Sequence, residues 1–353
     1  MYININKLKI IDFRSDTVSS VSRDMLDSIL TAELGDDGRS LRDPTVVKLE
    51  ELAAKKMGKE AGLLVPSGTM GNNVSILANT ERGNEIILDR ISHIFKSEHA
   101  YSLLIGNLHP VPIQSKLGYM DPNEVNNNVK TKGHIKTGLI CLENTHNEAG
   151  GIALTLDQMK SHWDIANEHN IPIHLDGARI FNASIYLGVD VKKIAQYADS
   201  LTFCLSKGLG APIGSVVCGT EEFIDKARYH RGLLGGKMRK AGIIAAPGIL
   251  ALTGKIDRLE QDHKMAQLLG EGIKDIEGIK LLHEIQTNII RIDVSGLGLN
   301  AMQFTKEIER YNILTEAKGH SVVRLVTHRD IEKEDVKYAI NSFNKLSRAR
   351  EHG

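Results

Sequence analysis

Three short segments of the chain carry residue types that together could bind a phosphate group and activate an amine. The segment VPSGTMGN (65–72) places Ser67 and Thr69 around a glycine at the start of a helical stretch, so hydroxyl and backbone N–H groups could hold an anion. Asp176 ends the apolar run IPIHLD, and Lys207 follows the apolar run SLTFCLS. A lysine in such a place can form an imine with a carbonyl compound.

Each of these features has a commoner structural explanation when it is considered alone. A Ser-Gly-Thr turn is an ordinary helix N-cap, an aspartate at a strand end often caps a helix, and most lysines at strand ends are solvated. Together, and in this order, they are the groups that pyridoxal phosphate requires: a phosphate site, a carboxylate that keeps the pyridine nitrogen protonated, and a lysine that forms the imine. The sequence therefore predicts a pyridoxal phosphate site.

Alternating strands and helices are predicted to position these groups. Amphipathic stretches such as 44–57, 156–169 and 221–229 predict helices, and short apolar runs between them are typical of strands buried on both faces. The predicted strands are 62–66, 85–89, 138–143, 171–176, 200–206 and 214–219. This pattern predicts an α/β domain whose sheet is mostly parallel and covered by helices on both faces. Functional residues are then expected at the carboxyl ends of the strands.

The pattern changes near residue 255, which predicts two domains. Residues 1–255 would form the large cofactor-binding domain, with the N-terminal segment contributing to its active site. Residues 256–353 would form a smaller α+β domain. Its predicted helices are 257–277, 301–311 and 331–348, and its predicted strands are 287–294 and 321–328.

Composition excludes several other classes of protein. Lys plus Arg and Asp plus Glu both number 44, so the formal net charge is zero and a nucleic-acid partner is not expected. No apolar run approaches the roughly 20 residues that span a bilayer, so we expect no membrane partner and a cytoplasmic location. The apolar surroundings of Cys141, Cys204 and Cys218 predict buried free thiols. No Cys/His ligand spacing appears, so no metal site is predicted.

Beyond these patterns, the sequence resembles a known family over the whole predicted large domain and part of the small one. It is similar to the low-specificity L-threonine aldolases of the β-eliminating lyase family, which are pyridoxal phosphate enzymes of the aspartate-aminotransferase fold. The matching stretches are DFRSDTV (12–18), GDD…DPTV (35–46), GKEAGLLVPSGTMGN (58–72), RISHIFKSE (90–98), LICLENTHNEAGG (139–151), HLDGARIFNA (174–183), DSLTFCLSKGLGAPIGSVVCG (199–219), LGGKMRKAGIIAA (234–246) and RLVTHRD (324–330).

The resemblance implies a role for each residue of the candidate site. Lys207 would form the imine with the cofactor, and Asp176 would pair with its pyridinium nitrogen. His93 would stack on the ring. Four residues would hold the phosphate, with the last of them near a subunit interface: Ser67, Gly68, Thr69 and Arg239.

A second group of residues would hold the substrate. The resemblance implies that Ser15, Arg179 and Arg324 grip the carboxylate of the amino acid, with Arg179 also close to the cofactor. His134 would lie close to the substrate hydroxyl, although the alignment there needs a gap of one residue. His93 or His134 is then the candidate base, acting directly or through a water molecule.

The expected reaction is cleavage of L-threonine or L-allo-threonine to glycine and acetaldehyde. An alternative on the same scaffold is β-elimination or racemisation of an amino acid. A scaffold that binds the cofactor without turnover, and an imine aldolase without cofactor, are further alternatives. The resemblance also implies a homodimer or homotetramer with active sites at the dimer interface.

Two of the stretches that depart from the family pattern lie in segments that line the active site in that family. The loop GDDGRSLRDPTV contains Arg39 and Arg42 in place of the family's aromatic residue, and residues 99–102 replace a pair of glycines. One hypothesis is that Arg39 or Arg42 favours a substrate with an anionic side chain. The alternative is a solvated loop that has no effect on the choice of substrate.

Overall fold

Two compact units make up the chain. The computed structural model describes residues 9–36, 42–98 and 105–351. The larger unit is residues 21–259, and the smaller one combines the described residues of the first 20 with those from 260 onward. The sequence placed the N-terminal segment in the large domain. It lies in the smaller unit instead, because Ile11 and Phe13 are buried in that unit's core.

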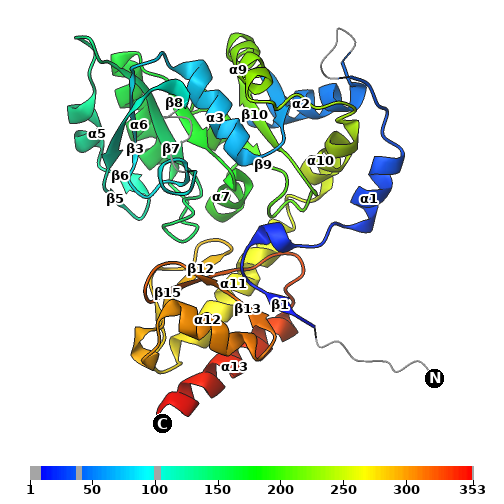
Figure 1. Cartoon of the computed structure of the whole chain (residues 1–353), viewed down its shortest axis with the longest axis vertical. Helices are drawn as coiled ribbons and strands as arrows, with labels where there is room; N and C mark the ends of the chain where they lie inside the picture. The colour runs from blue at the N-terminus through cyan, green and yellow to red at the C-terminus, as the bar shows by residue number, and fades with distance from the viewer. Residues whose placement is uncertain (1–8, 37–41, 99–104, 352–353) are drawn as a thin grey trace. The chain divides into compact units, whose positions relative to one another are not determined.

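The larger unit is built on a seven-stranded sheet, shown in Figure 1, with the strand order β2-β10-β9-β8-β7-β3-β4. Its strands are β2 (Ala61–Val65), β3 (Glu85–Asp89), β4 (His109–Ile113), β7 (Thr137–Glu143), β8 (Ile173–Asp176), β9 (Ser200–Cys204) and β10 (Ser215–Gly219). All neighbouring pairs are parallel except those of β10, which is antiparallel to both β2 and β9. The predicted mostly parallel α/β sheet is therefore confirmed.

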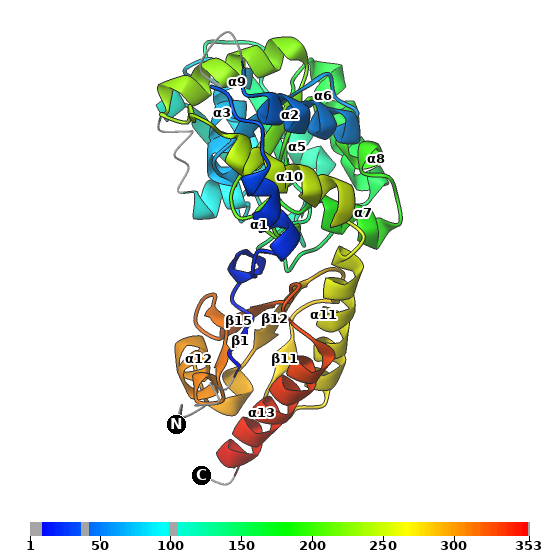
Figure 2. The ribbon, with the colours of Figure 1, turned by 90° about the vertical axis from the view of Figure 1, so that its right-hand side faces the viewer.

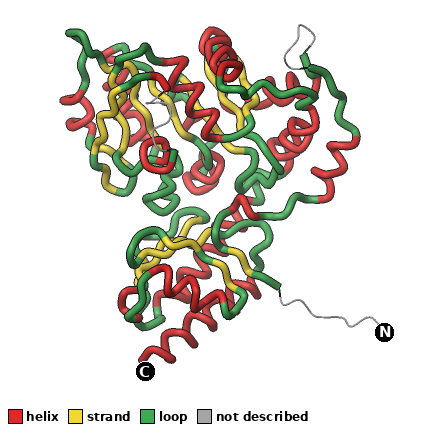
Figure 3. Tube along the Cα trace, in the orientation of Figure 1, coloured by secondary structure: helices red, strands yellow, loops and turns green. Residues whose placement is uncertain are grey.

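Helices cover both faces of this sheet, and a small hairpin of β5 (Ser115–Lys116) and β6 (Tyr119–Met120) follows β4. The helices are α1 (Arg23–Leu30), α2 (Pro44–Met57), α3 (Gly68–Asn79), α5 (Pro122–Asn128), α6 (Leu156–His169), α7 (Ile180–Leu187), α8 (Val191–Ala195), α9 (Glu221–Leu233) and α10 (Gly242–Gly254). Figure 3 shows how they flank the strands.

Successive side chains of strand β2 are buried on opposite faces of the sheet. Leu63 and Val65 pack with Val74 of α3 and Phe223 of α9 on one face. Leu64 lies between them in the chain and packs on the other face, in the core that contains α2 and α10. Because successive side chains of a strand point to opposite faces, an unbroken apolar run is needed here. Each large apolar side chain that is fully buried contributes roughly 1.5–3 kcal/mol.

Strand β4 has the sequence HPVPI and was not predicted. Its two prolines cannot donate hydrogen bonds to a neighbouring strand, so such a segment is tolerated only at the edge of a sheet. The structure places β4 at the edge, parallel to β3.

The smaller unit is an antiparallel sheet of four strands, in the order β11-β12-β15-β14, that packs with three helices around one core (Figure 2). A further parallel pair joins β1 to β13. The elements are β1 (Ile11–Asp12), α11 (Leu259–Lys274), β11 (Lys280–Leu281), β12 (Ile289–Asp293), α12 (Ala301–Glu309), β13 (Ile313–Leu314), β14 (Glu316–Ala317), β15 (Val322–Val326) and α13 (Lys333–Glu351).

The sequence also predicted that the three cysteines are buried free thiols and that no segment spans a membrane. Cys141, Cys204 and Cys218 are buried and free, as predicted. Among the residues that the structure describes, no helix combines the length and the apolar character needed to cross a bilayer.

Close packing of α3 on β9 gives a first testable prediction. A Cβ atom at Gly71 would lie 2.4 Å from Cγ2 of Thr202, which is fully buried. Gly71→Ala is therefore expected to lower the free energy of unfolding by about 1–3 kcal/mol, because the helix must move away from the sheet. Urea denaturation measures this. Gly254→Ala is the control, since a Cβ there meets nothing within 4 Å, and equal effects of the two substitutions would contradict the packing argument.

Candidate active site

A cavity of about 330 Å³ lies where the turns after β2, β8 and β9 meet. These three strands run in the same direction, so their carboxyl ends share one edge of the sheet. Six of the residues predicted from the sequence line this cavity: Ser67, Gly68, Thr69, His93, Asp176 and Lys207. The fold therefore brings the predicted phosphate turn, the carboxylate and the lysine together.

The phosphate side of the cavity is the first turn of α3. Ser67 is the N-cap, and its Oγ accepts a hydrogen bond from the backbone N–H of Met70 at 3.1 Å. The N–H groups of Gly68 and Thr69 have no partner within the helix, since they belong to its first turn. A Cβ at Gly68 would lie 2.9 Å from Sγ of Cys204, so the turn packs directly on β9. Ser67 is thus an ordinary helix cap that also leaves an anion site open.

Asp176 is held as a buried anion. Its side chain is 2% exposed and accepts hydrogen bonds from Nδ2 of Asn72 at 2.9 Å and from the N–H of Ala178 at 3.1 Å. Burial alone would raise the pKa of Asp176, but the electrostatic effects of the neighbouring His93 and Lys207, together with these hydrogen bonds, outweigh burial and lower the pKa. An ionised carboxylate at this place is suited to hold a protonated ring nitrogen.

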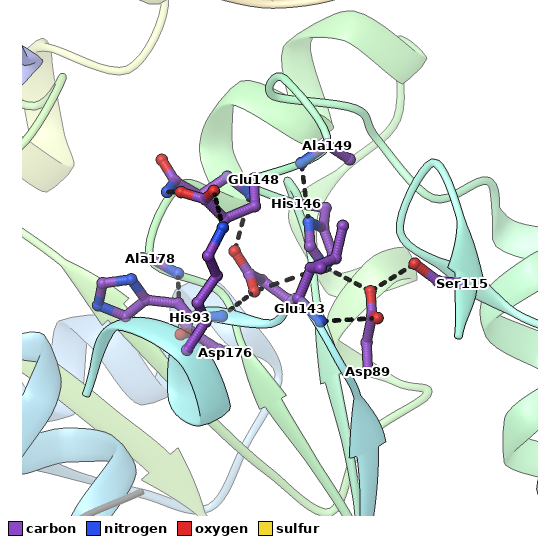
Figure 4. Close-up of polar contacts among 12 residues, drawn as sticks. Asp89, His93, Ser115, Glu143, His146, Glu148, Ala149, Asp176 and Ala178 are labelled. Atoms are coloured by element: carbon purple, nitrogen blue, oxygen red, sulfur yellow. Dashed lines mark hydrogen bonds and ion pairs between the residues drawn. The ribbon is translucent and has the colours of Figure 1, made fainter. Parts of the chain in front are cut away.

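The backbone of His93 is held by the carboxylate of Glu143, which was not among the predicted site residues. The backbone N–H of His93, at the start of the one-turn π-helix His93–Ser97, donates a hydrogen bond to Oε2 of Glu143 at 2.7 Å. The other oxygen of Glu143 accepts from the N–H of Asn147 at 2.8 Å. Figure 4 shows Glu143 between the backbone of His93 and the ring of His146.

Glu143 belongs to a larger buried polar cluster. Nε2 of His146 lies 2.8 Å from Asp89 Oδ2 and 3.7 Å from Glu143 Oε2, and Asp89 Oδ2 also accepts the hydroxyl of Ser115 at 2.6 Å (Figure 4). Burial opposes ionisation of His146, but the carboxylates outweigh it and raise the pKa of its imidazole. The position of Glu143 at the carboxyl end of β7 was a signal that could have indicated this cluster from the sequence.

Other predicted residues lie outside the cavity. His134 is exposed and precedes β7, at the amino end of the strand, whereas the cavity is at the carboxyl edge. Arg239 is exposed, and its Nη1 lies 2.5 Å from Oδ1 of Asp36. Arg179 is buried just before α7, and its Nη1 donates to Oδ1 of Asn147 at 3.4 Å.

Ser15 and Arg324 belong to the smaller unit. The hydroxyl oxygen of Ser15 accepts hydrogen bonds from the N–H and the hydroxyl of Thr17 at 3.2 and 2.8 Å. Arg324 lies on β15, where it pairs with Glu316 of β14 and donates to the carbonyl oxygen of Arg14 at 2.9 Å.

The hypothesis of an anionic substrate concerned Arg39 and Arg42 in the loop GDDGRSLRDPTV. Arg39, like residues 99–102, lies outside the described residues, whereas Arg42 is described. The guanidinium of Arg42 pairs with Glu50, which is 3% exposed and also accepts the N–H of Leu64 at 2.8 Å. Arg42 therefore pairs with the buried carboxylate that links α2 to β2, and Arg42 is not among the residues that line the cavity.

The residues of the cavity fit pyridoxal phosphate. The start of α3 offers N–H and hydroxyl groups to a phosphate, and Asp176 is a buried anion that can hold a protonated pyridine nitrogen. The half-buried Lys207 provides an amine on the same cavity. These are the three groups that the sequence predicted for this cofactor.

Comparison with known proteins agrees with this site. The β-eliminating lyase family model matches residues 12–295. The low-specificity L-threonine aldolase 1 of Arabidopsis thaliana is 41% identical to the chain, and the match covers 96% of each protein. The low specificity L-threonine aldolase of Escherichia coli (strain K12) is 38% identical, over 92% of this chain and 96% of that protein.

Solved structures show the same fold at low sequence identity. The Leishmania major threonine aldolase superposes with a TM-score of 0.78 at 17% identity, covering 96% of this chain and 99% of that one. A serine palmitoyltransferase of Sphingomonas wittichii gives a TM-score of 0.79 at 16% identity, covering 98% and 89%. The fold and the site define a pyridoxal phosphate enzyme scaffold. On the family match, the chain belongs to the β-eliminating lyase family.

Proposed function

We propose that the protein cleaves L-threonine or L-allo-threonine into glycine and acetaldehyde, with pyridoxal phosphate as cofactor. The observation that carries this proposal is the meeting of the Ser67 turn, Asp176 and Lys207 on one cavity. Relatives at 38–41% identity over more than nine tenths of the chain are named low-specificity L-threonine aldolases, which supports the choice of reaction.

The residues of the chain would divide the work as follows. When bound, pyridoxal phosphate supplies a ring that can accept the electron pair of the Cα–Cβ bond. Lys207 would provide the amine that binds the cofactor's aldehyde, and Asp176 would hold the ring nitrogen protonated. Ser67, with the N–H groups after it, would bind the phosphate. His93 lines the same cavity and is a candidate to stack on the ring and to exchange a proton with the substrate hydroxyl.

Several roles remain predictions from the family resemblance. Arg179, Ser15 and Arg324 are expected to bind the substrate carboxylate, and guanidinium groups suit this task. Arg239 is expected to assist with phosphate binding. The resemblance also implied that His134 lies near a substrate hydroxyl, but His134 precedes β7 at the amino end of the strand, and the cavity is at the carboxyl edge.

We also propose a homodimer or homotetramer in the cytoplasm. Large apolar side chains are exposed on two helices of the larger unit, among them Leu26 and Leu30 of α1 and Tyr229 and Leu233 of α9. Exposed apolar groups of this kind are common where subunits associate. Sedimentation equilibrium would test the proposal, and a monomer at micromolar concentration would contradict it.

A product assay tests the reaction directly. The holoenzyme is incubated separately with L-threonine and L-allo-threonine, and three sets of products are measured. Equal amounts of glycine and acetaldehyde are expected. Formation of 2-oxobutanoate with ammonia would instead indicate β-elimination, and accumulation of D-amino acids would indicate racemisation. Either result without acetaldehyde would overturn the proposal but leave the cofactor site intact.

A further inference from the structure

A second acidic side chain lies on the cavity and has no part in the function proposed above. Glu98 follows the π-helix His93–Ser97, is 4% exposed and lines the cavity. Its Oε1 atom accepts a hydrogen bond from Nδ2 of Asn72 at 3.1 Å and lies 3.6 Å from Nε2 of His93. Its Oε2 atom is buried. The side chain of Thr69, on the same cavity, also interacts with the Glu98 carboxyl group.

Asn72 links Glu98 to Asp176. The amide Nδ2 of Asn72 donates to both carboxylates, at 3.1 and 2.9 Å. Its Oδ1 lies 3.1 Å from Nε2 of His174, and Nδ1 of His174 lies 3.1 Å from the hydroxyl of Ser200. Burial lowers the pKa of His174 to about 4, so the ring is neutral at pH 7 and donates to Asn72 from Nε2. This contact fixes the orientation of the amide and holds Glu98 and Asp176 at a set separation.

Burial and the charges around Glu98 favour its protonated form. The titratable groups that face it are Asp176 of β8, Lys207 after β9, His93 of its own segment and the thiol of Cys141 on β7. Burial, and then the negative charge of Asp176, raise the pKa of Glu98 to about 7. Since two neighbouring carboxylates resist being charged together, Asp176 keeps its charge and Glu98 takes up the proton.

We infer that Glu98 and His93, 3.6 Å apart on the cavity, act together as the acid–base pair that receives the proton of the substrate's β-hydroxyl group. The inference rests on the proposed aldol cleavage. It gives His93, which otherwise acts alone, a buried carboxylate partner on the same cavity. The partner stabilises the imidazole when it accepts a proton, as a carboxylate does for a histidine base in other enzymes.

A group that holds one proton matches the proton balance of the reaction. The O–H bond of the hydroxyl breaks as the C=O bond of acetaldehyde forms, and the electron pair of the Cα–Cβ bond remains with the glycine half. The glycine half then gains one proton at Cα. One proton is released and one is consumed, so a group that holds a single proton between the two events closes the cycle without any oxidant or reductant.

Glu98→Gln tests the inference, because it keeps the shape of the side chain and removes its titration. In the wild-type holoenzyme, kcat/KM is expected to rise with pH through an acidic limb near pH 7, since the pair accepts a proton only after Glu98 has lost its own. In Glu98→Gln the limb is expected to move by at least about one pH unit, and kcat to fall about 10²-fold while KM changes little. Glu98→Asp retains a carboxyl group and should keep the limb near neutral pH.

Glu85→Gln is the matched control. Glu85 is also a buried glutamate, 7% exposed, but it begins β3 at the amino edge of the sheet and pairs with Lys130 at 2.6 Å. Glu85→Gln should therefore leave the acidic limb of kcat/KM at the same pH as in the wild type. If the limb of Glu98→Gln coincides with that of the wild type, Glu98 is only structural and the inference is wrong, even if the rate falls.

Infrared spectroscopy gives a readout that does not depend on turnover. In the full chain, with and without pyridoxal phosphate, the band of a protonated carboxyl group should titrate near pH 7 in the wild type and be absent in Glu98→Gln. If no such band titrates, the inference is wrong. If the band is present but wild-type protein releases no acetaldehyde, the proton on Glu98 stands and the proposed function is what has failed.

Discussion

Replacing Lys207 by alanine is expected to reduce acetaldehyde release from L-threonine at least about 10³-fold, because no other amine lines the cavity among the described residues. The yellow absorbance of an imine should be lost as well. Pyridoxal phosphate should still bind, since the start of α3 and Asp176 are untouched. Initial rates, absorbance spectra and cofactor affinity of the purified variant measure these effects.

Lys207→Arg separates the charge of the lysine from its chemistry. Arginine keeps a positive charge near Asp176, where the charge of Lys207 helps to lower the pKa of the carboxyl group. It cannot form the imine, so it should be as inactive as Lys207→Ala. An arginine variant that retains a tenth or so of the wild-type rate would show that Lys207 acts only as a charge.

Asp176→Asn is expected to lower kcat by about 10²–10³-fold with a smaller effect on cofactor affinity. Asn72 and Ala178 donate to different oxygens of Asp176, at 2.9 and 3.1 Å, so the single side-chain oxygen of asparagine can keep only one of these hydrogen bonds. The variant also loses the buried negative charge, and with it the means to keep the ring nitrogen protonated. Steady-state kinetics and a cofactor titration distinguish the two effects.

A surface carboxylate provides the control for this substitution. Asp164 lies on α6, where it pairs with Lys160 at 2.5 Å and is about half exposed. Asp164→Asn should behave like the wild type in both assays. If Asp176→Asn also retains wild-type kcat, the assignment of Asp176 to the ring nitrogen is wrong.

The sequence predicted the central sheet well, because burial on both faces leaves a clear pattern. The run 85–89 is β3, and 214–219 contains β10 with one residue to spare. Helix α2 matches the predicted 44–57, since Asp43 caps it, Pro44 begins it and the left-handed Gly58 ends it. Strand β4 was missed, because its prolines suppress the strand pattern and only its position at the edge makes it possible.

The sequence predicted those site residues that directly follow a strand, but not those that reach the cavity through contacts between distant segments. Asp176 and Lys207 each follow an apolar strand, so their common edge can be inferred from the sequence. Glu98 lies five residues after His93 and reaches the cavity only because a π-helix places both side chains there. Its hydrogen bond to Asn72 joins residues that are 26 positions apart. No local pattern records that contact, nor the pairing of Glu143 with the backbone of His93.

The central claim is that Lys207 holds pyridoxal phosphate on the cavity at the ends of β8 and β9. Borohydride reduction of the holoenzyme, followed by digestion and mass spectrometry, tests it most directly, because reduction fixes the cofactor to the amine that binds it. We expect one phosphopyridoxyl group per chain, on the peptide that contains Lys207. Label on another amine, such as the largely buried Lys59 whose pKa is lowered by burial, or no label at all, would contradict the claim.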